Sequence, residues 1–148
     1  MFEFLRYRVE DAMTSDPVCA APDAVLGKLQ EIFEARDFNS IPIVDANCAL
    51  LGVVTKLDIL KAFALTPQAI VPRYDDIMAN TKAADVMTRE PVTASPELPL
   101  SRLLQRLVEM RVKSFPVVRD GIVVGVIARE DVLRALRAAI HPSQEPSR

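Results

Sequence analysis

The sequence predicts an α+β fold made of two pseudo-symmetric β-α-β-β-α repeats that pack sheet to sheet. The first observation is that six of the 11 prolines form three pairs, because Pro17, Pro22 and Pro42 each recur 74 residues later. The second is that neighbouring residues recur at this spacing, which becomes 73 after one residue is lost at a turn, as for Asp58 and Asp131. A fixed-period duplication of this kind divides a chain into equivalent units. Each unit of roughly 52 residues is too small to be stable alone, so we expect the two to share one core.

Each repeat is expected to begin with a short extended piece and a first helix. In the first repeat residues 17–20 are extended, and Pro22 and Asp23 open the helix, because proline suits a first helical turn and aspartate suits the positive helix end. The apolar residues that follow recur at helical spacing, which predicts one buried face on each helix: Leu26, Leu29 and Phe33 in the first repeat, and Leu100, Leu103, Leu104 and Leu107 in the second.

Two strands and a second helix complete each repeat. Residues 41–44 form an apolar strand whose proline must sit at an end or an edge, because proline cannot donate to a ladder. A turn leads to the next strand. In the second repeat that turn contains Asp120 and Gly121, which is a strong hairpin signal. The second helices are expected over residues 57–63 and 130–140.

The chain therefore divides into four segments. We expect the first repeat at residues 9–63, a linker at 64–83, the second repeat at 84–140 and a flexible tail at 141–148. Within the linker, residues 75–82 are expected to form a further helix.

Composition excludes several classes of function. The formal net charge of −2 gives no general attraction to nucleic acid, and no uncharged apolar run approaches the ~18 residues of a membrane span. Cys19 and Cys48 make neither a disulfide framework nor a metal-type spacing, and the single histidine is His141. The sequence thus predicts a reduced, cytoplasmic protein with no catalytic residue and no metal site.

The ordered motifs of both repeats resemble the cystathionine-β-synthase (CBS) domain, and two in tandem resemble a stand-alone Bateman module. The resemblance rests on Met13-Thr14, Pro17-Val18, Pro22-Asp23 and residues 41–45 and 51–60, with Met87-Thr88, Pro91-Val92 and residues 115–118 and 125–133 in the second copy. It implies a regulatory module, not an enzyme. Such modules bind adenosine-containing ligands (AMP, ADP, ATP or S-adenosylmethionine) in clefts between the repeats. It also implies a homodimer and a regulated protein partner that the sequence does not identify.

Thr55 and Asp58 follow a strand and open a helix, and two interpretations of them can hold together. In the first they form a capping box, with the hydroxyl and the carboxylate serving early helix N–H groups. In the second the same helix start binds a phosphate through free N–H groups and the hydroxyl, while the carboxylate accepts from both ribose hydroxyls. The resemblance implies the second set of roles, with Thr55 on phosphate and Asp58 on ribose.

An adenine ring needs an apolar slot with backbone partners. The resemblance places that slot, with the neighbouring threonines, at Thr14, Val18, Cys19, Ala20, Ile41 and Pro42, and at Thr88, Val92, Thr93, Ala94, Phe115 and Pro116 in the second repeat. The alternative is ordinary core strand, which we favour for Val18 and Ile41. For Cys19, Ala20 and Pro42 we favour the slot, because a proline leaves neighbouring backbone groups unpaired.

The second repeat departs from this pattern. Ala128 stands where the first repeat has Thr55, and alanine can neither cap a helix nor bond a phosphate. Asp131 keeps the ribose function, and Arg129 either supplies a charge for phosphate or is a solvated residue at the helix start. We therefore expect two unequal sites, with the stronger at Asp58. The alternative function is a non-catalytic structural or interaction dimer whose clefts do not bind nucleotide.

Overall fold

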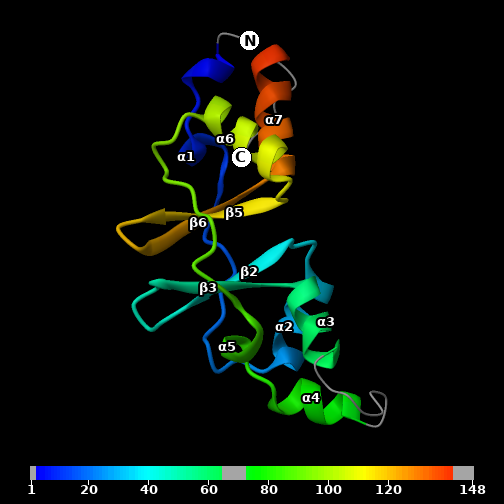
Figure 1. Ribbon diagram of the computed structural model, residues 1–148. Helices are drawn as coiled ribbons and strands as arrows, with labels where there is room; N and C mark the ends of the chain where they lie inside the picture. Colours follow the sequence, from blue (N-terminus) through cyan, green and yellow to red (C-terminus); the bar gives the residue numbers. More distant parts are fainter. Residues whose placement is uncertain (1–2, 65–72, 142–148) are drawn as a thin grey trace. The chain divides into compact units, whose positions relative to one another are not determined.

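The computed structural model describes residues 3–64 and 73–141 and has a mixed α+β architecture (Figure 1). The chain divides into two compact units. Unit 1 comprises residues 1–17 and 92–148, and unit 2 comprises residues 18–91. Each unit contains one three-stranded antiparallel sheet and its own helices, which confirms the predicted α+β class. The expected single core is not found among the described residues, because the buried side chains form two core clusters, one in each unit.

Unit 2 is built on a sheet with the strand order β2-β3-β4. Its elements are α2 (Leu26–Ala35), β2 (Ser40–Val44), β3 (Leu50–Thr55), α3 (Lys56–Ala64), α4 (Tyr74–Asn80), α5 (Ala83–Val86) and β4 (Thr88–Arg89). One face of α2 is buried at Leu26, Leu29 and Phe33, as the helical spacing predicts. These side chains pack with Ile41, Ile43 and Val54 of the sheet and with Ile59 of α3.

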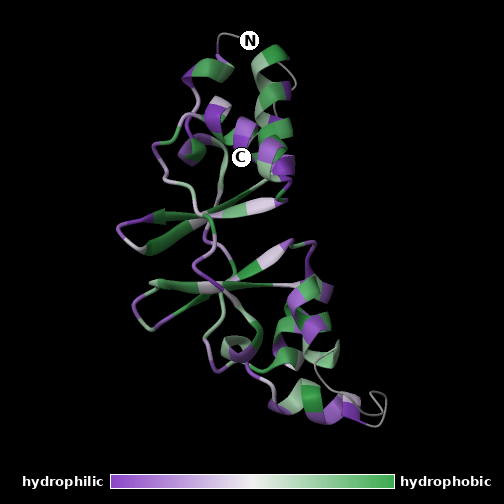
Figure 2. Ribbon diagram, viewed as in Figure 1, coloured by the Kyte–Doolittle hydropathy of each residue, from purple (hydrophilic) through white to green (hydrophobic). Residues whose placement is uncertain are grey.

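Unit 1 repeats this plan with the strand order β1-β6-β5. Its elements are η1 (Phe4–Arg6), α1 (Val9–Ala12), β1 (Thr14–Ser15), α6 (Leu100–Met110), β5 (Ser114–Arg119), β6 (Ile122–Ala128) and α7 (Arg129–Ile140). Its core joins Leu100, Leu103 and Leu107 to Phe115 and Ile127. Figure 2 shows the same contrast in both units, with mostly apolar residues along the strands, polar residues at the hairpin turns, and apolar and polar residues interspersed along the helices.

Each sheet is completed by a strand that precedes the other repeat in sequence. Thr14 of β1 pairs with Val126 of β6, and Thr88 of β4 pairs with Val53 of β3. The compact units therefore do not coincide with the segments 9–63 and 84–140 expected from the repeat. As a result, Thr88 shares a unit with Asp58, and Thr14 shares a unit with Asp131.

The predicted start of the first helix is wrong by about one turn. Helix α2 begins at Leu26, whereas Pro22 and Asp23 lie in a turn before it. The physical reason is that the backbone between Pro22 and α2 forms hydrogen bonds with the chain around the start of α5. The Leu26 N–H donates to the Thr81 carbonyl at 2.9 Å, and the Ala24 carbonyl accepts from the Ala83 N–H at 2.7 Å. Those tertiary hydrogen bonds hold residues 24 and 25 outside the helix.

Other local predictions are confirmed. The β5–β6 hairpin turns at Asp120 and Gly121, whose φ angles of 52° and 82° are both positive, as a two-residue hairpin turn of this type requires. The expected helix over residues 75–82 is α4. The remainder of the predicted linker includes residues 65–72, and the predicted tail includes residues 142–148. Both stretches lie outside the described residues.

Gly52 and Gly125 allow the short strands to dock. A Cβ atom on Gly52 would lie 2.6 Å from the Thr88 carbonyl oxygen, and one on Gly125 would lie 2.6 Å from the Met13 sulfur and 2.8 Å from the Thr14 carbonyl oxygen. These distances are shorter than van der Waals contact allows, so the backbone of β4 or β1 would have to move.

We predict that Gly52→Ala and Gly125→Ala each lower the free energy of unfolding by about 1–3 kcal/mol, the usual effect of overpacking. Urea unfolding followed by circular dichroism measures the change. Gly27→Ala is the control, because its Cβ would lie 3.3 Å from the Met78 carbonyl oxygen and 4.0 Å from the carbonyl carbon, both longer than the contacts at Gly52 and Gly125, and alanine favours the helix. Equal stability of Gly52→Ala and the unmodified protein would contradict the docking role.

Candidate functional site

The candidate site in unit 2 is the junction where β3 ends at Thr55 and α3 begins. The Asp58 Oδ2 atom accepts from the Thr55 N–H at 2.9 Å and from the Thr55 hydroxyl at 3.0 Å. The same hydroxyl accepts from the Asp58 N–H at 3.2 Å. This is the reciprocal capping box that the sequence predicts. It fixes a carboxylate that is only 3% exposed directly beside a hydroxyl at a helix start.

The other carboxylate oxygen of Asp58 is held less firmly. Its contacts are the Thr88 hydroxyl at 3.4 Å, which lies at the same distance from Oδ2, and the Lys61 ammonium at 3.7 Å. Both distances exceed those of strong charge-assisted hydrogen bonds. Of the two carboxylate oxygens of Asp58, Oδ1 is therefore the one whose present contacts would compete least with the two hydroxyls of a ribose.

Unit 1 carries the same junction with weaker capping and a stronger ion pair. Asp131 Oδ2 accepts from the Ala128 N–H at 2.8 Å, but residue 128 has no hydroxyl to reciprocate. Asp131 Oδ1 accepts from the Arg134 guanidinium at 3.1 Å. Thr14 occupies the strand position equivalent to that of Thr88. The second carboxylate thus has both oxygens engaged at short distance.

Arg129 has a structural contact that neither sequence interpretation included. Its guanidinium donates to the Val112 carbonyl at 3.0 Å and to the Arg111 carbonyl at 3.3 Å, just beyond the end of α6. Arg111 adopts a left-handed conformation there, with φ of 54°. Arg129 therefore ties the start of α7 to the end of α6.

The predicted adenine slot of unit 2 lies beside this junction. Ile41 pairs with Val54, so β2 runs next to the strand end at Thr55. The Ala20 N–H donates to the Pro42 carbonyl at 3.0 Å, which places residues 18–20 along the outer edge of β2. The side chain of Ile41 is fully buried in the core, as favoured from the sequence, so only its backbone could face a ligand. The same expectation is wrong for Val18, which is only half-buried and belongs to neither core cluster. The sequence predicts unpaired backbone groups next to Pro42, whereas the carbonyl of Pro42 itself accepts the hydrogen bond from Ala20.

The corresponding segment of unit 1 has the same arrangement. The Ala94 N–H donates to the Pro116 carbonyl at 3.0 Å, and Phe115 is buried in the core. Val92 is 47% exposed, and Thr93 is half-buried. The slot residues therefore gather along the edge of β5, as their counterparts gather along β2.

Sequence reasoning missed the two cations beside the buried carboxylates. Lys61 and Arg134 each lie three residues after the aspartate, one helical turn further on. The signal was present, because both repeats place a basic residue at this spacing, where side chains on a helix meet. A ribose would have to share the carboxylate with these cations.

The described residues hold neither a metal-binding cluster nor a helix that could span a membrane. Residues 3–64 and 73–141 contain no group of three or more histidine, cysteine or acidic side chains arranged to hold a metal ion. Within the same ranges, no helix is long and apolar enough to cross a membrane.

Both junctions lie in segments of the chain that match the model of one protein family. The model of the CBS domain matches the chain twice, over residues 9–65 and 83–138. The chain belongs to the CBS domain family. Each match contains one buried aspartate at a strand–helix junction, which is Asp58 in the first and Asp131 in the second.

A curated relative of this CBS chain is the L-aspartate semialdehyde sulfurtransferase of Methanocaldococcus jannaschii, which is 28% identical over 127 residues. The match covers 85% of the chain but only 22% of the relative. The chain therefore spans less than a quarter of that enzyme's length.

Solved structures match over nearly the whole length. A Vibrio cholerae protein that bears the name acetoin utilization protein AcuB is 25% identical, with a TM-score of 0.80 over 96% of this chain and 98% of the other. The CBS domain pair of MJ0100, solved with 5′-methylthioadenosine and S-adenosyl-L-methionine, is 26% identical. Its TM-score is 0.70 over 90% of this chain and 98% of the other.

The two junctions differ in capping at residues 55 and 128, so we expect opposite effects on stability when these two residue types are exchanged. We expect Thr55→Ala to lower the free energy of unfolding by about 1 kcal/mol, because Asp58 loses a donor and its N–H loses an acceptor. Ala128→Thr should raise that free energy by up to about 1 kcal/mol, because it adds the missing cap. Urea unfolding of both variants tests the pair. A stabilising Thr55→Ala or a destabilising Ala128→Thr would contradict this role for the hydroxyl.

The two thiols should differ in reactivity. Burial, and secondarily the nearby Cys48, raises the pKa of Cys19, whereas Cys48 is exposed. Less thiolate is present at Cys19 at neutral pH, so we predict that iodoacetamide alkylates Cys48 first, with Cys19 labelled faster as the pH rises. Mass spectrometry of the folded protein measures the order, and urea-unfolded protein, in which both thiols are open, is the control. Faster labelling of Cys19 in the folded state would refute the assignment.

Proposed function

We propose that this CBS pair is a cytoplasmic regulatory module that binds an adenosine-containing ligand and passes the resulting conformational change to a protein partner. The observation that carries the proposal is the Asp58 carboxylate, buried and fixed by Thr55, with one oxygen held only at 3.4 and 3.7 Å. A carboxylate of this kind can accept from both hydroxyls of a ribose. The role is binding, not catalysis.

The junction also suits the phosphate of a nucleotide. The Thr55 hydroxyl has a single proton, which it now donates to Asp58 Oδ2. When a phosphate binds, that proton can turn to the phosphate oxygen, while the Asp58 backbone N–H still donates to the same hydroxyl. Free N–H groups at the start of α3 add to the attraction. The adenine ring would then lie along residues 18–20 and the start of β2.

The MJ0100 CBS pair supports the ligand class, because it was solved with two adenosine compounds. We propose the same class here, namely AMP, ADP, ATP or S-adenosylmethionine. The second site, at Asp131, is the weaker one, because Ala128 offers no hydroxyl and the Arg134 guanidinium occupies Oδ1 at 3.1 Å. Such a site favours a ligand without phosphate.

The module is proposed to act as a homodimer. A ligand can change the output only if it binds one conformational state of the module better than another, so its effect on the partner depends on that difference in affinity.

The alternative is an interaction dimer whose sites bind no nucleotide. The observation that favours it is that both buried carboxylates already have intramolecular partners, with none of their oxygens unbonded. The weak contacts of Asp58 Oδ1 favour the first function instead.

Isothermal titration calorimetry with AMP, ADP, ATP and S-adenosylmethionine tests the proposal, supported by thermal unfolding with each ligand. At about 100 times its dissociation constant, a ligand should stabilise the fold by about 2.7 kcal/mol. We expect Asp58→Asn to weaken binding at the stronger site at least about tenfold, since charge-assisted hydrogen bonds to ribose are lost. Asp131→Asn should have a smaller effect on phosphorylated ligands.

Asp85→Asn is the matched control. Asp85 occupies the same third position of a helix and accepts from the Lys82 N–H at 2.9 Å, but it is exposed and lies at the start of α5. This variant should bind like the unmodified protein. If none of the four ligands changes the thermal transition, or if Asp58→Asn binds as well as the control, the interaction-dimer alternative is favoured.

A further inference from the structure

Arg134 covers the buried carboxylate of unit 1. Its guanidinium donates to Asp131 Oδ1 at 3.1 Å, while Oδ2 accepts from the Ala128 N–H at 2.8 Å. The Asp131 side chain is only 8% exposed, whereas the Arg134 side chain is 47% exposed. The guanidinium thus reaches a buried carboxylate from a side that is open to solvent. A ribose has to displace this cation before its hydroxyls can reach Oδ1.

Asp131 has fewer other donors than its counterpart in unit 2. Asp58 accepts from the hydroxyls of Thr55 and Thr88 as well as from a backbone N–H. In unit 1 an alanine replaces the first threonine, and among the described residues the Thr14 hydroxyl is not a donor to Asp131. A buried carboxylate with few donors is costly, so Arg134 carries a large share of its stabilisation.

A second carboxylate lies within reach of Arg134 on the same helix. Glu130 precedes Arg134 by four residues, and at this spacing an acidic residue followed by a basic one forms a favourable pair on a helix surface. Glu130 is exposed and forms no ion pair with any residue in the described part of the chain. The guanidinium can therefore leave Asp131 without losing an ionic partner.

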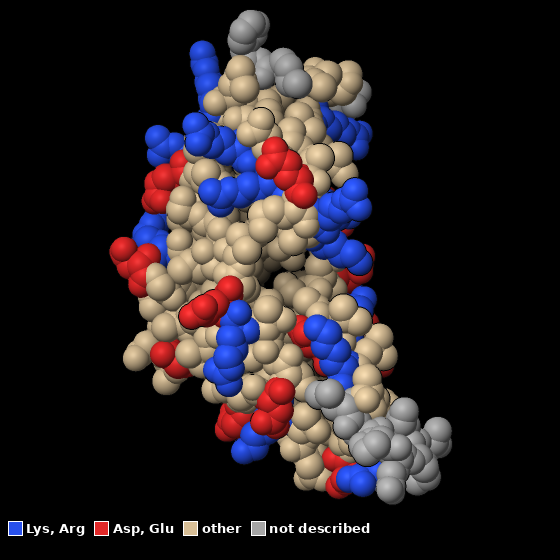
Figure 3. Space-filling model, in the orientation of Figure 1, with Lys and Arg blue, Asp and Glu red and all other residues tan. Residues whose placement is uncertain are grey.

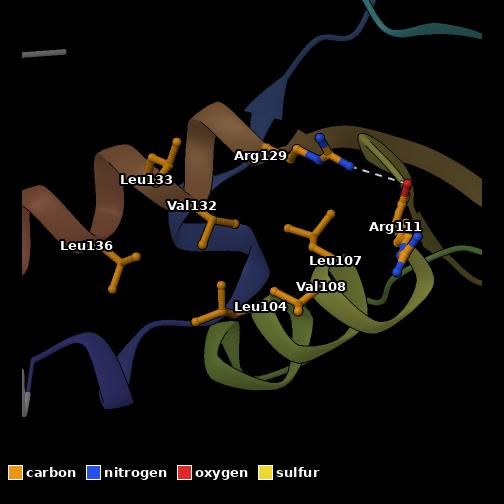
Figure 4. A pocket seen from close by; sticks show the side chains of 8 residues that line it. All are labelled: Leu104, Leu107, Val108, Arg111, Arg129, Val132, Leu133 and Leu136. Carbon is orange, nitrogen blue, oxygen red and sulfur yellow. Dashed lines mark hydrogen bonds between the residues drawn. The ribbon is translucent and has the colours of Figure 1, made fainter.

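The other arginine at the start of α7 is engaged elsewhere. The Arg129 guanidinium donates to the Val112 carbonyl at 3.0 Å and to the Arg111 carbonyl at 3.3 Å. Figure 4 shows the Arg129 side chain directed towards the end of α6. An exchange between the two carboxylates is thus left to Arg134.

Unit 2 lacks this second partner. Lys61 stands where unit 1 has Arg134, and Leu57 stands where it has Glu130. The Lys61 ammonium lies 3.7 Å from Asp58 Oδ1, which is longer than the equivalent contact in unit 1. The two sites therefore differ in kind, because the carboxylate of unit 2 is open to a ribose and that of unit 1 has to be uncovered.

We propose that Arg134 is a positioning residue that gates the Asp131 site by moving between two carboxylates. Paired with Asp131, it excludes the ribose hydroxyls. Paired with Glu130, it leaves Oδ1 free to accept from them. The inference rests on the proposed function and specifies how one of its two sites is regulated. The structure shows the closed pairing, so a ligand binds only the open fraction of molecules and the apparent affinity falls by that fraction.

Titration calorimetry with adenosine tests the gate in an Asp58→Asn background, which removes the stronger site. Arg134→Gln should tighten adenosine binding about tenfold, because the competing charge-assisted hydrogen bond is gone. It should leave the binding of 2′,3′-dideoxyadenosine unchanged, because that compound has no ribose hydroxyls. It should also lower the midpoint of thermal unfolding by about 2–4 °C, since Asp131 loses a donor. A purely structural role predicts weaker binding together with the lower midpoint.

Glu130→Gln tests the second partner of the guanidinium. With Arg134 present, this substitution should weaken adenosine binding about twofold, because the open state loses its ion pair. In the Arg134→Gln variant the same substitution should have no effect on binding. An equal effect with and without Arg134 would contradict the exchange between the two carboxylates.

Arg137→Gln is the matched control. In the view of Figure 3, basic side chains are numerous over unit 1, so the loss of any one of them lowers the local positive potential. Arg137 is exposed on the same helix and forms no ion pair within residues 3–64 and 73–141. This variant should bind adenosine like the background protein.

The outcomes separate the gate from the proposed function. If adenosine compounds bind the unmodified protein but Arg134→Gln does not tighten binding at Asp131, the gate is overturned and the proposed function stands. If the unmodified protein binds none of them, binding that appears with Arg134→Gln supports the gate. Absence of binding in both proteins overturns the gate together with the proposed function.

Discussion

The constraint on which both units depend is a buried carboxylate at the third position of the helix that follows the central strand. Asp58 and Asp131 are the only charged residues buried in the described part of the chain. Each bonds back to the N–H of the last strand residue at 2.9 or 2.8 Å. Because a buried charge without partners is costly, this junction fixes the direction in which the helix leaves the sheet. The candidate ribose contact is therefore also the contact that organises each unit.

The duplicated fold has diverged at the positions where chemistry is at stake. The strand positions, the hairpins and the buried aspartates are kept in both repeats. Thr55 of the first repeat is replaced by Ala128 in the second. The cation beside the aspartate is Lys61, 3.7 Å from Asp58, in the first repeat and Arg134, 3.1 Å from Asp131, in the second. The same architecture thus presents one carboxylate with a weakly held oxygen and one with both oxygens engaged. Divergence also separates the outer surfaces, where Asp37 and Arg111 give equivalent helix ends opposite charge.

Sequence reasoning succeeded where the determinant is local. The capping box at Thr55, the hairpin at Asp120 and the buried faces of α2 and α6 depend on residues within one or two turns of each other. It failed at Pro22, because hydrogen bonds to residues 81–84 keep the residues before Leu26 out of the helix, and no local signal records them. It also did not show that β1 and β4 are exchanged between the sheets, since their two-residue pairings depend on close approach to Gly125 and Gly52.

The sequence by itself determined the duplication, the α+β class, the CBS resemblance and the identity of the two key aspartates, because each is encoded in spacing and residue type. Only the tertiary structure decided which threonine accompanies which aspartate, how firmly each carboxylate oxygen is held and which cations approach it. Those properties depend on distances between segments far apart in the chain, as between Thr88 and Asp58. The prolines that revealed the repeat mark equivalent points along the chain, but packing decided where those points lie in space.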